Sequence, residues 1–310
     1  METPHRPQVL QMGSSVAHVR RVGKGVTPYL LIAPALLIIL GLVIYPLGLS
    51  FYSSLRIDDF LYPGLHTFVG LKNYDAVLTD PTFQEAMRNT AIYWGLTSVT
   101  VLAVAVSMAV WLKSLPMRWR AGFLVVVILP WAVPGVVTGL LWSLIYNPTS
   151  GILDGLLKNF GLISHNIVWF NHPGWALVLI TVALLWQITP LATVILFAGM
   201  ESIPPTLYEA AKVDGSTPWR TFRYITVPLL RPAVAIVMVQ TTVLSIGVFD
   251  QVYVLAGYAP STRSVVIQTY LYAFQNLNFG QGISAALLIT MAITIIGYLY
   301  LRIVYREVSY

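Results

Sequence analysis

Amide and hydroxyl side chains occur inside long apolar stretches of this 310-residue chain. Gln187 lies in one such stretch, and Gln240, Thr241 and Ser245 lie close together in another. Side chains of this kind hydrogen-bond the hydroxyl groups of an uncharged sugar, and an aromatic ring such as that of Trp186 covers the C–H surface of the sugar. Together they predict a pathway for a neutral, hydroxyl-rich solute rather than bond-breaking chemistry.

Depth along a helix, at about 1.5 Å per residue, supports this interpretation. Gln187 stands about 18 Å from the start of its stretch at Trp175. Gln240 and Thr241 stand about 12–14 Å beyond Pro232. These values place all three near the middle of a hydrocarbon core that is about 30 Å thick.

A structural alternative is open for the same residues. Thr241 and Ser245 can bond the carbonyl one turn earlier in their own helix. Gln187 and Gln240 can join neighbouring helices instead of facing a solute. Asp250 is the acidic residue that comes nearest to a span interior, at about 27 Å along its helix. We therefore expect Asp250 at the outer mouth of the pathway, in contact with water.

Sequence signatures of catalysis and metal binding are missing. Neither a His-Glu-x-x-His nor a Gly-x-Ser-x-Gly pattern occurs, and the Gly-Lys pair at Gly23 and Lys24 lacks the other residues of a phosphate-binding Walker A loop. The chain has no cysteine, which excludes disulfides and thiolate metal sites. We therefore expect no enzymatic activity, no metal site and no cofactor in this chain.

The elements that carry these residues are long apolar helices. Of the residues, 57% are hydrophobic and only 10% are charged, whereas a soluble domain carries about a quarter charged residues. The basic residues stand at the ends of apolar stretches rather than in one patch, which argues against nucleic-acid binding. An all-α polytopic membrane protein is expected, because six stretches reach the roughly 20 residues that a spanning helix needs. They are Pro28–Tyr52, Asn89–Leu112, Gly122–Tyr146, Trp175–Met200, Ala233–Ala256 and Gly282–Tyr305.

The distribution of Lys and Arg sets the expected orientation. With six spans both termini lie on one side, and 13 of the 18 Lys and Arg residues fall on that side. Cytoplasmic loops are enriched in these residues, so we predict cytoplasmic N and C termini. The expected division is a cytoplasmic N-terminal segment, residues 1–27, a six-helix domain, residues 28–305, and a cytoplasmic tail, residues 306–310.

One cytoplasmic loop, residues 201–232, is long enough to fold by itself. We predict a first helix that begins near Pro205 and ends at Gly215, which supplies a left-handed residue. A second helix should run to about Thr226 and stop before Pro228. Such a pair either lies on the membrane surface as an amphipathic anchor or projects into a groove of a partner protein.

Part of this loop resembles a known motif. Glu209-Ala210-Ala211, Asp214-Gly215 and Pro228 follow the spacing of the EAA loop in permease subunits of ATP-binding-cassette (ABC) importers. Other segments are similar to the carbohydrate-type permeases, the class of the maltose, trehalose and glycerol-3-phosphate importers. These segments are Phe68–Tyr74, Leu129–Pro134 and Phe249–Leu255.

The resemblance implies a non-catalytic permease subunit that forms half of a translocation pathway for a sugar such as trehalose or maltose. It implies a heterodimer with a second permease, two cytoplasmic subunits that bind ATP and Mg, and an external substrate-binding protein, in the inner membrane of a prokaryote. Glu209 would contact the ATPase or brace the two helices, and Gly215 would permit the turn. By the same resemblance Gln187, Thr241 and Ser245 are the first choices for substrate contact, and Leu184, Leu191 and Leu244 are expected to line the path.

Other functions are open at this point. The same architecture could import glycerol-3-phosphate or another small solute, although no Lys or Arg lies in mid-span to meet an anion. A self-sufficient secondary transporter would need inverted repeats and buried ionisable relays, which the sequence lacks. The outer loops are candidates for docking the binding protein, through Asp58, Asp59, Tyr62 and residues 147–154.

Overall fold

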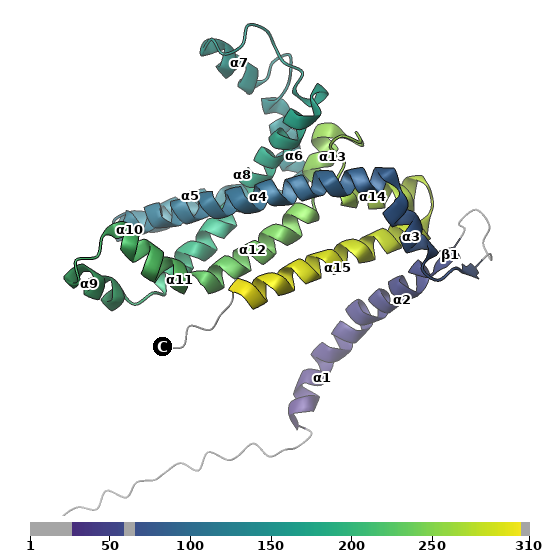
Figure 1. Ribbon diagram of the computed structural model, residues 1–310, viewed down its shortest axis with the longest axis horizontal. Helices are drawn as coiled ribbons and strands as arrows, with labels where there is room; N and C mark the ends of the chain where they lie inside the picture. The colour runs from purple at the N-terminus through teal and green to yellow at the C-terminus, as the bar shows by residue number, and fades with distance from the viewer. Residues whose placement is uncertain (1–26, 59–65, 305–310) are drawn as a thin grey trace, which may run out of the picture. The chain divides into compact units, whose positions relative to one another are not determined.

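The computed structural model describes residues 27–58 and 66–304 (Figure 1). The chain forms two compact units, residues 1–49 and residues 50–310. The predicted terminal segments, and the docking candidates Asp59 and Tyr62, lie outside the described residues.

The first unit is helical from its first described residue. Helix α1 (Thr27–Ile39) continues through a π turn, η1 (Leu40–Ile44), into α2 (Tyr45–Ser54), whose last residues belong to the second unit. Residues Leu31–Ser54 are long and apolar enough to cross a membrane. This segment coincides with the predicted span Pro28–Tyr52.

The second unit opens with a short antiparallel strand pair, β1 (Arg56–Asp58) and β2 (His66–Phe68). Helix α3 (Lys72–Thr79) follows, and its buried Asn73 donates a 2.8 Å hydrogen bond to the carbonyl of Arg56. The amide thereby satisfies a backbone group at the strand end. This strand pair is a small exception to the predicted all-α fold.

Helix α4 (Pro81–Ser114) begins about two turns before the predicted span Asn89–Leu112. Asp80 caps the helix, because its carboxylate accepts a 2.8 Å hydrogen bond from the N–H of Thr82. Pro81 suits the first position, where no N–H is needed. The extension therefore has a local cause in the Asp-Pro pair.

The predicted third span, Gly122–Tyr146, is broken. It consists of α5 (Met117–Ile128), the 3-10 turn η2 (Leu129–Ala132) and α6 (Gly135–Ile145). The two parts meet at 94°. Pro134 causes the break, because it forces Val133 out of the helical region, to φ −77° and ψ 126°. The predicted span is thus a bent pair of helices instead of one continuous helix.

The connection to the fourth span is folded. It carries α7 (Ile152–Asn159) and the turn η3 (Trp169–Asn171), and it leads into α8 (Pro173–Glu201). Asp154 is only 2% exposed, and its carboxylate accepts hydrogen bonds from Ile167 N at 2.9 Å and Trp169 Nε1 at 2.7 Å. Asp154 therefore organises this loop, which contradicts its expected role as a docking residue.

The remainder of the chain contains the loop of residues 201–232 and the last two spans. The loop holds α9 (Pro205–Val213), α10 (Pro218–Thr221), the π turn η4 (Phe222–Thr226) and α11 (Val227–Leu229). Then follow α12 (Arg231–Ile246), α13 (Asp250–Ala256), α14 (Val265–Tyr270), the π turn η5 (Leu271–Gln275) and α15 (Phe279–Val304). The predicted fifth span, Ala233–Ala256, is thus interrupted at residues 247–249.

In the second unit α4, α8, α12 and α15 run alongside one another, with α9–α11 at one end and α3 and α14 at the other (Figure 1). Tyr93, Ile180 and Leu196 are fully buried between these helices. Among the described residues, five helices are long and apolar enough to cross a membrane, and the broken pair α5–α6 gives a sixth. The chain is a mostly helical polytopic membrane protein, and the side on which the termini lie stays a prediction.

Candidate functional site

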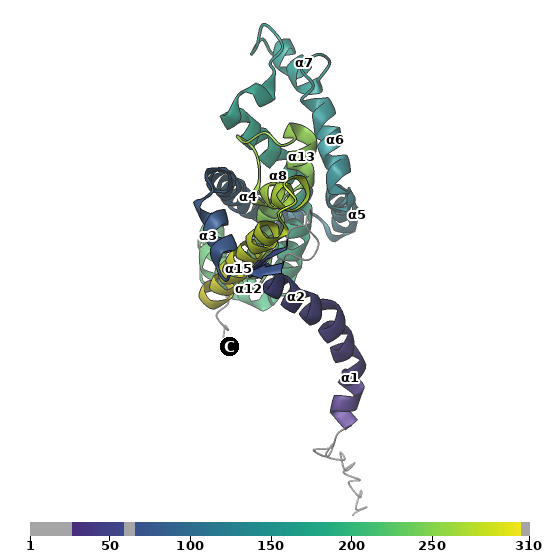
Figure 2. The same cartoon turned by 90° about the vertical axis from the view of Figure 1, so that its right-hand side faces the viewer.

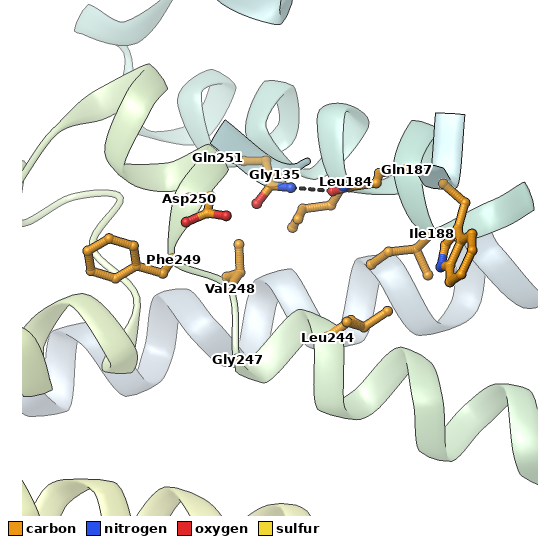
Figure 3. A pocket seen from close by; sticks show the side chains of 11 residues that line it. Gly135, Leu184, Gln187, Ile188, Leu244, Gly247, Val248, Phe249, Asp250 and Gln251 are labelled. Carbon is orange, nitrogen blue, oxygen red and sulfur yellow. Dashed lines mark hydrogen bonds between the residues drawn. The ribbon is translucent and has the colours of Figure 1, made fainter. Parts of the chain in front are cut away.

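A cavity of about 280 Å³ lies where the two broken spans meet α8 (Figure 3). Helix α13 packs against both α6 and α8 around it (Figure 2). Of the residues predicted for the pathway, the cavity brings together Leu184, Gln187, Leu244 and Asp250. The other lining residues are Trp131, Gly135, Ile188, Gly247, Val248, Phe249 and Gln251.

Gln187 connects the two helix breaks. Its Nε2 donates a 2.6 Å hydrogen bond to the carbonyl of Val133, and its Oε1 accepts one from Nε2 of Gln251 (Figure 3). The Val133 carbonyl lies at the break before Pro134, where the helical hydrogen bonds end and an apolar medium offers no replacement. Gln187 therefore joins neighbouring elements, as the structural alternative expected, and it also lines the cavity.

Asp250 stands at the start of α13 and packs closely on the first turn of α6. A β-carbon added to Gly135 would lie 2.4 Å from Oδ2 of Asp250, and one added to Gly139 would lie 2.7 Å from Cβ of Val254. Small residues four apart let two membrane helices approach in this way. The positive N-terminal end of α6 also favours the Asp250 carboxylate at this position.

The chemistry of the cavity wall is set by a few polar groups. Asp250 is the one charged residue among the described lining residues, and Gln187 and Gln251 add two amides. The rings of Trp131 and Phe249 complete a wall that can meet both the hydroxyls and the C–H surface of a neutral solute. An anion would meet a carboxylate and no cation on this wall.

Thr241 and Ser245 lie in the packing of α12 rather than on the cavity. They are 1% and 0% exposed, and Oγ of Ser245 donates a 2.7 Å hydrogen bond to the carbonyl of Thr241. Within the described residues Oγ1 of Thr241 has no hydrogen-bond partner. For this pair the structural alternative describes the contacts, and their place on the pathway stays a prediction.

Trp186, Gln240 and Leu191 are also absent from the cavity wall. Trp186 lies edge-on to Trp142, with ring centroids 6.3 Å apart, and borders a separate cavity of about 450 Å³ between α4, α5 and α8. Gln240 is half-buried on α12. Counting residues along a helix predicts the depth of a side chain but not the helix face on which it lies. These three residues have suitable positions along their helices but do not line this cavity.

The helix pair of residues 201–232 is built around Gly215, which has φ +69°. The N–H of Ser216 donates to the carbonyl of Ala211 at 2.9 Å, and the N–H of Gly215 to that of Lys212 at 3.1 Å. These two bonds form the Schellman motif that ends a helix at a left-handed glycine. The predicted turn at Gly215 is confirmed.

The second helix does not stop before Pro228. Thr217 caps α10 through its side chain, and the helical backbone continues through η4 into α11. In this π turn the N–H of Val227 donates to the carbonyl of Phe222, so the wider turn accommodates a residue that cannot donate. The predicted end at Thr226 is wrong, and the loop leads almost without interruption into α12.

Tyr208 braces the helix pair against the spans. Its hydroxyl lies 3.2 Å from Oγ1 of Thr226, and the ammonium of Lys113 lies 4.5 Å from the centroid of its ring. Lys113 also donates a 2.7 Å hydrogen bond to the carbonyl of Met200 at the end of α8. Glu209 itself is exposed and forms no ion pair within the described part of the chain, so the bracing role falls to Tyr208.

Comparison with known proteins assigns the chain to a family. Residues 101–310 match the binding-protein-dependent transport system inner membrane components. The chain belongs to this family. The trehalose/maltose transport system permease protein MalF of Thermococcus litoralis is 31% identical to this permease over 276 residues, which cover 89% of this chain and 92% of that protein.

Two further proteins resemble the permease over most of its length. The sulfoquinovosyl glycerol transport system permease protein SmoG of Agrobacterium fabrum is 29% identical over 289 residues, covering 91% of this chain and 92% of that one. A solved bacterial ABC transporter involved in the import of the acidic polysaccharide alginate matches with a TM-score of 0.76 at 19% identity, covering 91% and 96% of the two chains. That likeness shows a shared fold.

Several cavity residues of the permease were missed by reasoning on residue type and depth. Trp131 lies within Leu129–Pro134, and Gln251 lies within Phe249–Leu255, two segments that the sequence marks only by their family resemblance. The usable physical signal was Pro134, together with Gly247 at the break in the fifth span. A helix breaker inside an apolar span marks a place where side chains and backbone groups face a cavity.

Proposed function

We propose that this permease forms half of the translocation pathway for a neutral carbohydrate, such as trehalose or maltose, in an ABC importer. The observation that carries the proposal is the cavity wall, with two amides, one carboxylate, two aromatic rings and no cation among its lining residues. Amides and a carboxylate hydrogen-bond sugar hydroxyls, and rings cover the C–H faces. The name of the Thermococcus litoralis relative, a trehalose/maltose permease, supports the same substrate class.

The loop of residues 201–232 is proposed to couple this pathway to a separate ATPase. The exposed Glu209 and Asp214 present two carboxylates beside the Gly215 turn, while Tyr208 ties the loop to the spans through Lys113. A rigid projection with a charged tip suits docking in a protein groove. In this proposal the coupling residues are Glu209, Ala210, Ala211, Asp214, Gly215 and Pro228.

The proposed assembly places both termini and this loop in the prokaryotic cytoplasm. It contains a second permease, two subunits that bind ATP and Mg, and an external substrate-binding protein, while this chain holds no cofactor. Purification of the chain from its native membrane in mild detergent tests the assembly. An ATPase and a second multi-span subunit should accompany it, and a lone chain that transports without ATP would contradict the proposal.

Import of glycerol-3-phosphate is the second candidate, and Asp250 separates the two. Asp250→Asn removes the charge and keeps the shape, so sugar uptake should fall by about 3- to 10-fold, because charge-assisted hydrogen bonds are roughly twice as strong as neutral ones. Uptake of an anion should rise instead, since the repulsion is removed. ATP-dependent uptake of labelled trehalose, maltose and glycerol-3-phosphate by the reconstituted transporter shows whether the uptake of each solute rises or falls. Asp75→Asn, at an exposed position on α3, is the control.

A further inference from the structure

Aromatic rings form an unbroken chain that starts at the cavity and leaves it. Successive ring centroids lie between 5.1 and 6.3 Å apart. We call this group the aromatic track. Its members are Phe249, Tyr253, Tyr258, Tyr270, Phe274 and Phe279.

The track joins the cavity to an exposed surface. Phe249 lines the cavity, and its ring stacks on Tyr253 at 5.7 Å and meets Tyr270 edge-on at 5.6 Å. Farther along, Phe274 is 61% exposed and Tyr253 is 43% exposed. Exposed aromatic rings therefore continue directly into the wall of the proposed sugar pathway.

A rigid frame holds the loop between α13 and α14 that carries the middle of the track. Arg263 NH2 donates to the carbonyl of Tyr258 at 2.6 Å, and Ser264 Oγ donates to that of Val248 at 2.7 Å. From α4, Asn89 Nδ2 donates to the carbonyl of Pro260 at 2.9 Å. These hydrogen bonds hold the backbone of the loop at Tyr258 in place before any ligand arrives, which lowers the entropic cost of binding.

The phenol group of Tyr258, in the middle of the track, remains a hydrogen-bond donor at neutral pH. Desolvation and the neighbouring hydroxyls of Tyr253 and Tyr270 raise the pKa of Tyr258 to about 12. A protonated phenol donates to one sugar hydroxyl and accepts from another. The track thus offers aromatic faces, which can cover the C–H surface of a sugar, together with phenol groups, which can bond the sugar hydroxyls.

We propose that the aromatic track is a carbohydrate-binding surface on which a sugar stacks before it enters the cavity at Phe249. This inference rests on the proposed sugar-import function and extends it to residues outside the cavity. The occupant is a neutral sugar because the six members carry no charge and the track ends in the cavity wall. Lipid and the second permease are the other possible occupants, and the tests below separate them.

The absence of cysteine from the chain allows a direct test by site-specific labelling. Phe274→Cys on the track and Phe160→Cys, equally aromatic and 76% exposed beside α7, are placed one at a time in the complete transporter. Maleimide labelling of this chain is then followed with and without maltose, trehalose or a linear maltodextrin as probe. The probe sugars should slow labelling at Phe274→Cys several-fold and leave Phe160→Cys unchanged.

Two outcomes of the labelling experiment would contradict the proposal that the aromatic track binds sugar. One is equal labelling of Phe274→Cys with and without every probe sugar that the transporter imports. The other is a cysteine that labels in the isolated chain but not in the sugar-free transporter or its lipid nanodisc, which would assign the rings to a subunit or lipid contact. If the wild-type transporter imports no neutral sugar at all, the proposed function is contradicted. If it imports sugar but the sugar does not protect Phe274→Cys, only the track is contradicted.

Transport kinetics give a second, independent test. Removing one ring with Tyr270→Ala should raise the KM for sugar about 3- to 10-fold, since one aromatic contact contributes that much to binding. Tyr270→Phe keeps the ring and should restore KM to within about 2-fold of wild type. Co-purification of the second permease with each variant shows whether assembly is intact. Equal KM values for Tyr270→Ala and wild type would contradict the proposal.

Discussion

The cavity and the loop of residues 201–232 both depend on interrupted helices, but the interruptions differ in kind. At the cavity, Pro134 and Gly247 stop their helices and leave backbone groups that Gln187 and its neighbours must satisfy. At the loop, the Gly215 turn satisfies its own backbone through a Schellman motif, and the π turn at η4 carries the helix past Pro228.

The difference teaches where each region can tolerate change. The cavity takes its geometry from long-range side-chain contacts, so single side chains there control both its shape and the polarity of its wall. The loop takes its geometry from local backbone conformation and presents its charged side chains to the exterior. A substitution that changes only a side chain should therefore affect the cavity strongly, and one that changes the backbone should affect the loop strongly.

The largest effect is expected for Gly215→Pro. Proline holds φ near −65°, whereas Gly215 has φ +69°, so the turn between α9 and α10 cannot form. ATP-driven uptake should fall to background, with the ATPase either uncoupled or dissociated. Uptake and ATP hydrolysis by the reconstituted transporter measure this. Gly215→Asn is the matched control, because asparagine tolerates the left-handed region, and normal uptake by Gly215→Pro would contradict the coupling role.

The next effect is expected for Gln187→Leu. The change leaves the Val133 carbonyl and the Gln251 amide without their partner, at about 1–3 kcal/mol for each unsatisfied group. Uptake should fall by one to two orders of magnitude while the subunits still co-purify. Thr241→Val is the contrasting variant: the buried Thr241 hydroxyl has no partner in the described structure, so its loss should leave uptake unchanged. Equal effects of both variants would place the pathway elsewhere.

A smaller effect is expected for Gly135→Ala. The added methyl would overlap Oδ2 of Asp250 and push α6 away from α13, which should lower thermal stability by about 1–3 kcal/mol. Gly155→Ala in α7 meets nothing within 4 Å and should be neutral or slightly stabilising. Thermal unfolding of the purified transporter, followed by the fluorescence of tryptophan, compares the two. A destabilised Gly155→Ala beside an unchanged Gly135→Ala would contradict the close approach.

Local signals in the sequence predicted the loop better than the cavity. The left-handed conformation of Gly215 follows from the residue types at the end of the first helix, and it is found in the structure. The π turn was missed because a proline such as Pro228 ordinarily ends a helix. Whether a wider turn accommodates the proline depends on the whole segment.

The cavity could be predicted only in part. The helical rise placed Gln187 at a useful depth, but it could not show that Thr241 is buried within the packing of α12. Asp250 was placed by counting along one continuous helix, and the interruption at residues 247–249 removes the basis of that count. The tertiary fold decides which residues come together at the two helix breaks. The spacing of residues along the chain does not predict these contacts.

The helical run from η4 through α11 into α12 connects the loop of residues 201–232 to the cavity. Helix α12 has 16 residues, which gives an arm of about 24 Å. A tilt of about 5° at the loop end would then displace the far end by about 2 Å, by the same helical rise. Leu244 and Gly247 stand at that far end, so a small tilt at the loop end would change the shape of the cavity.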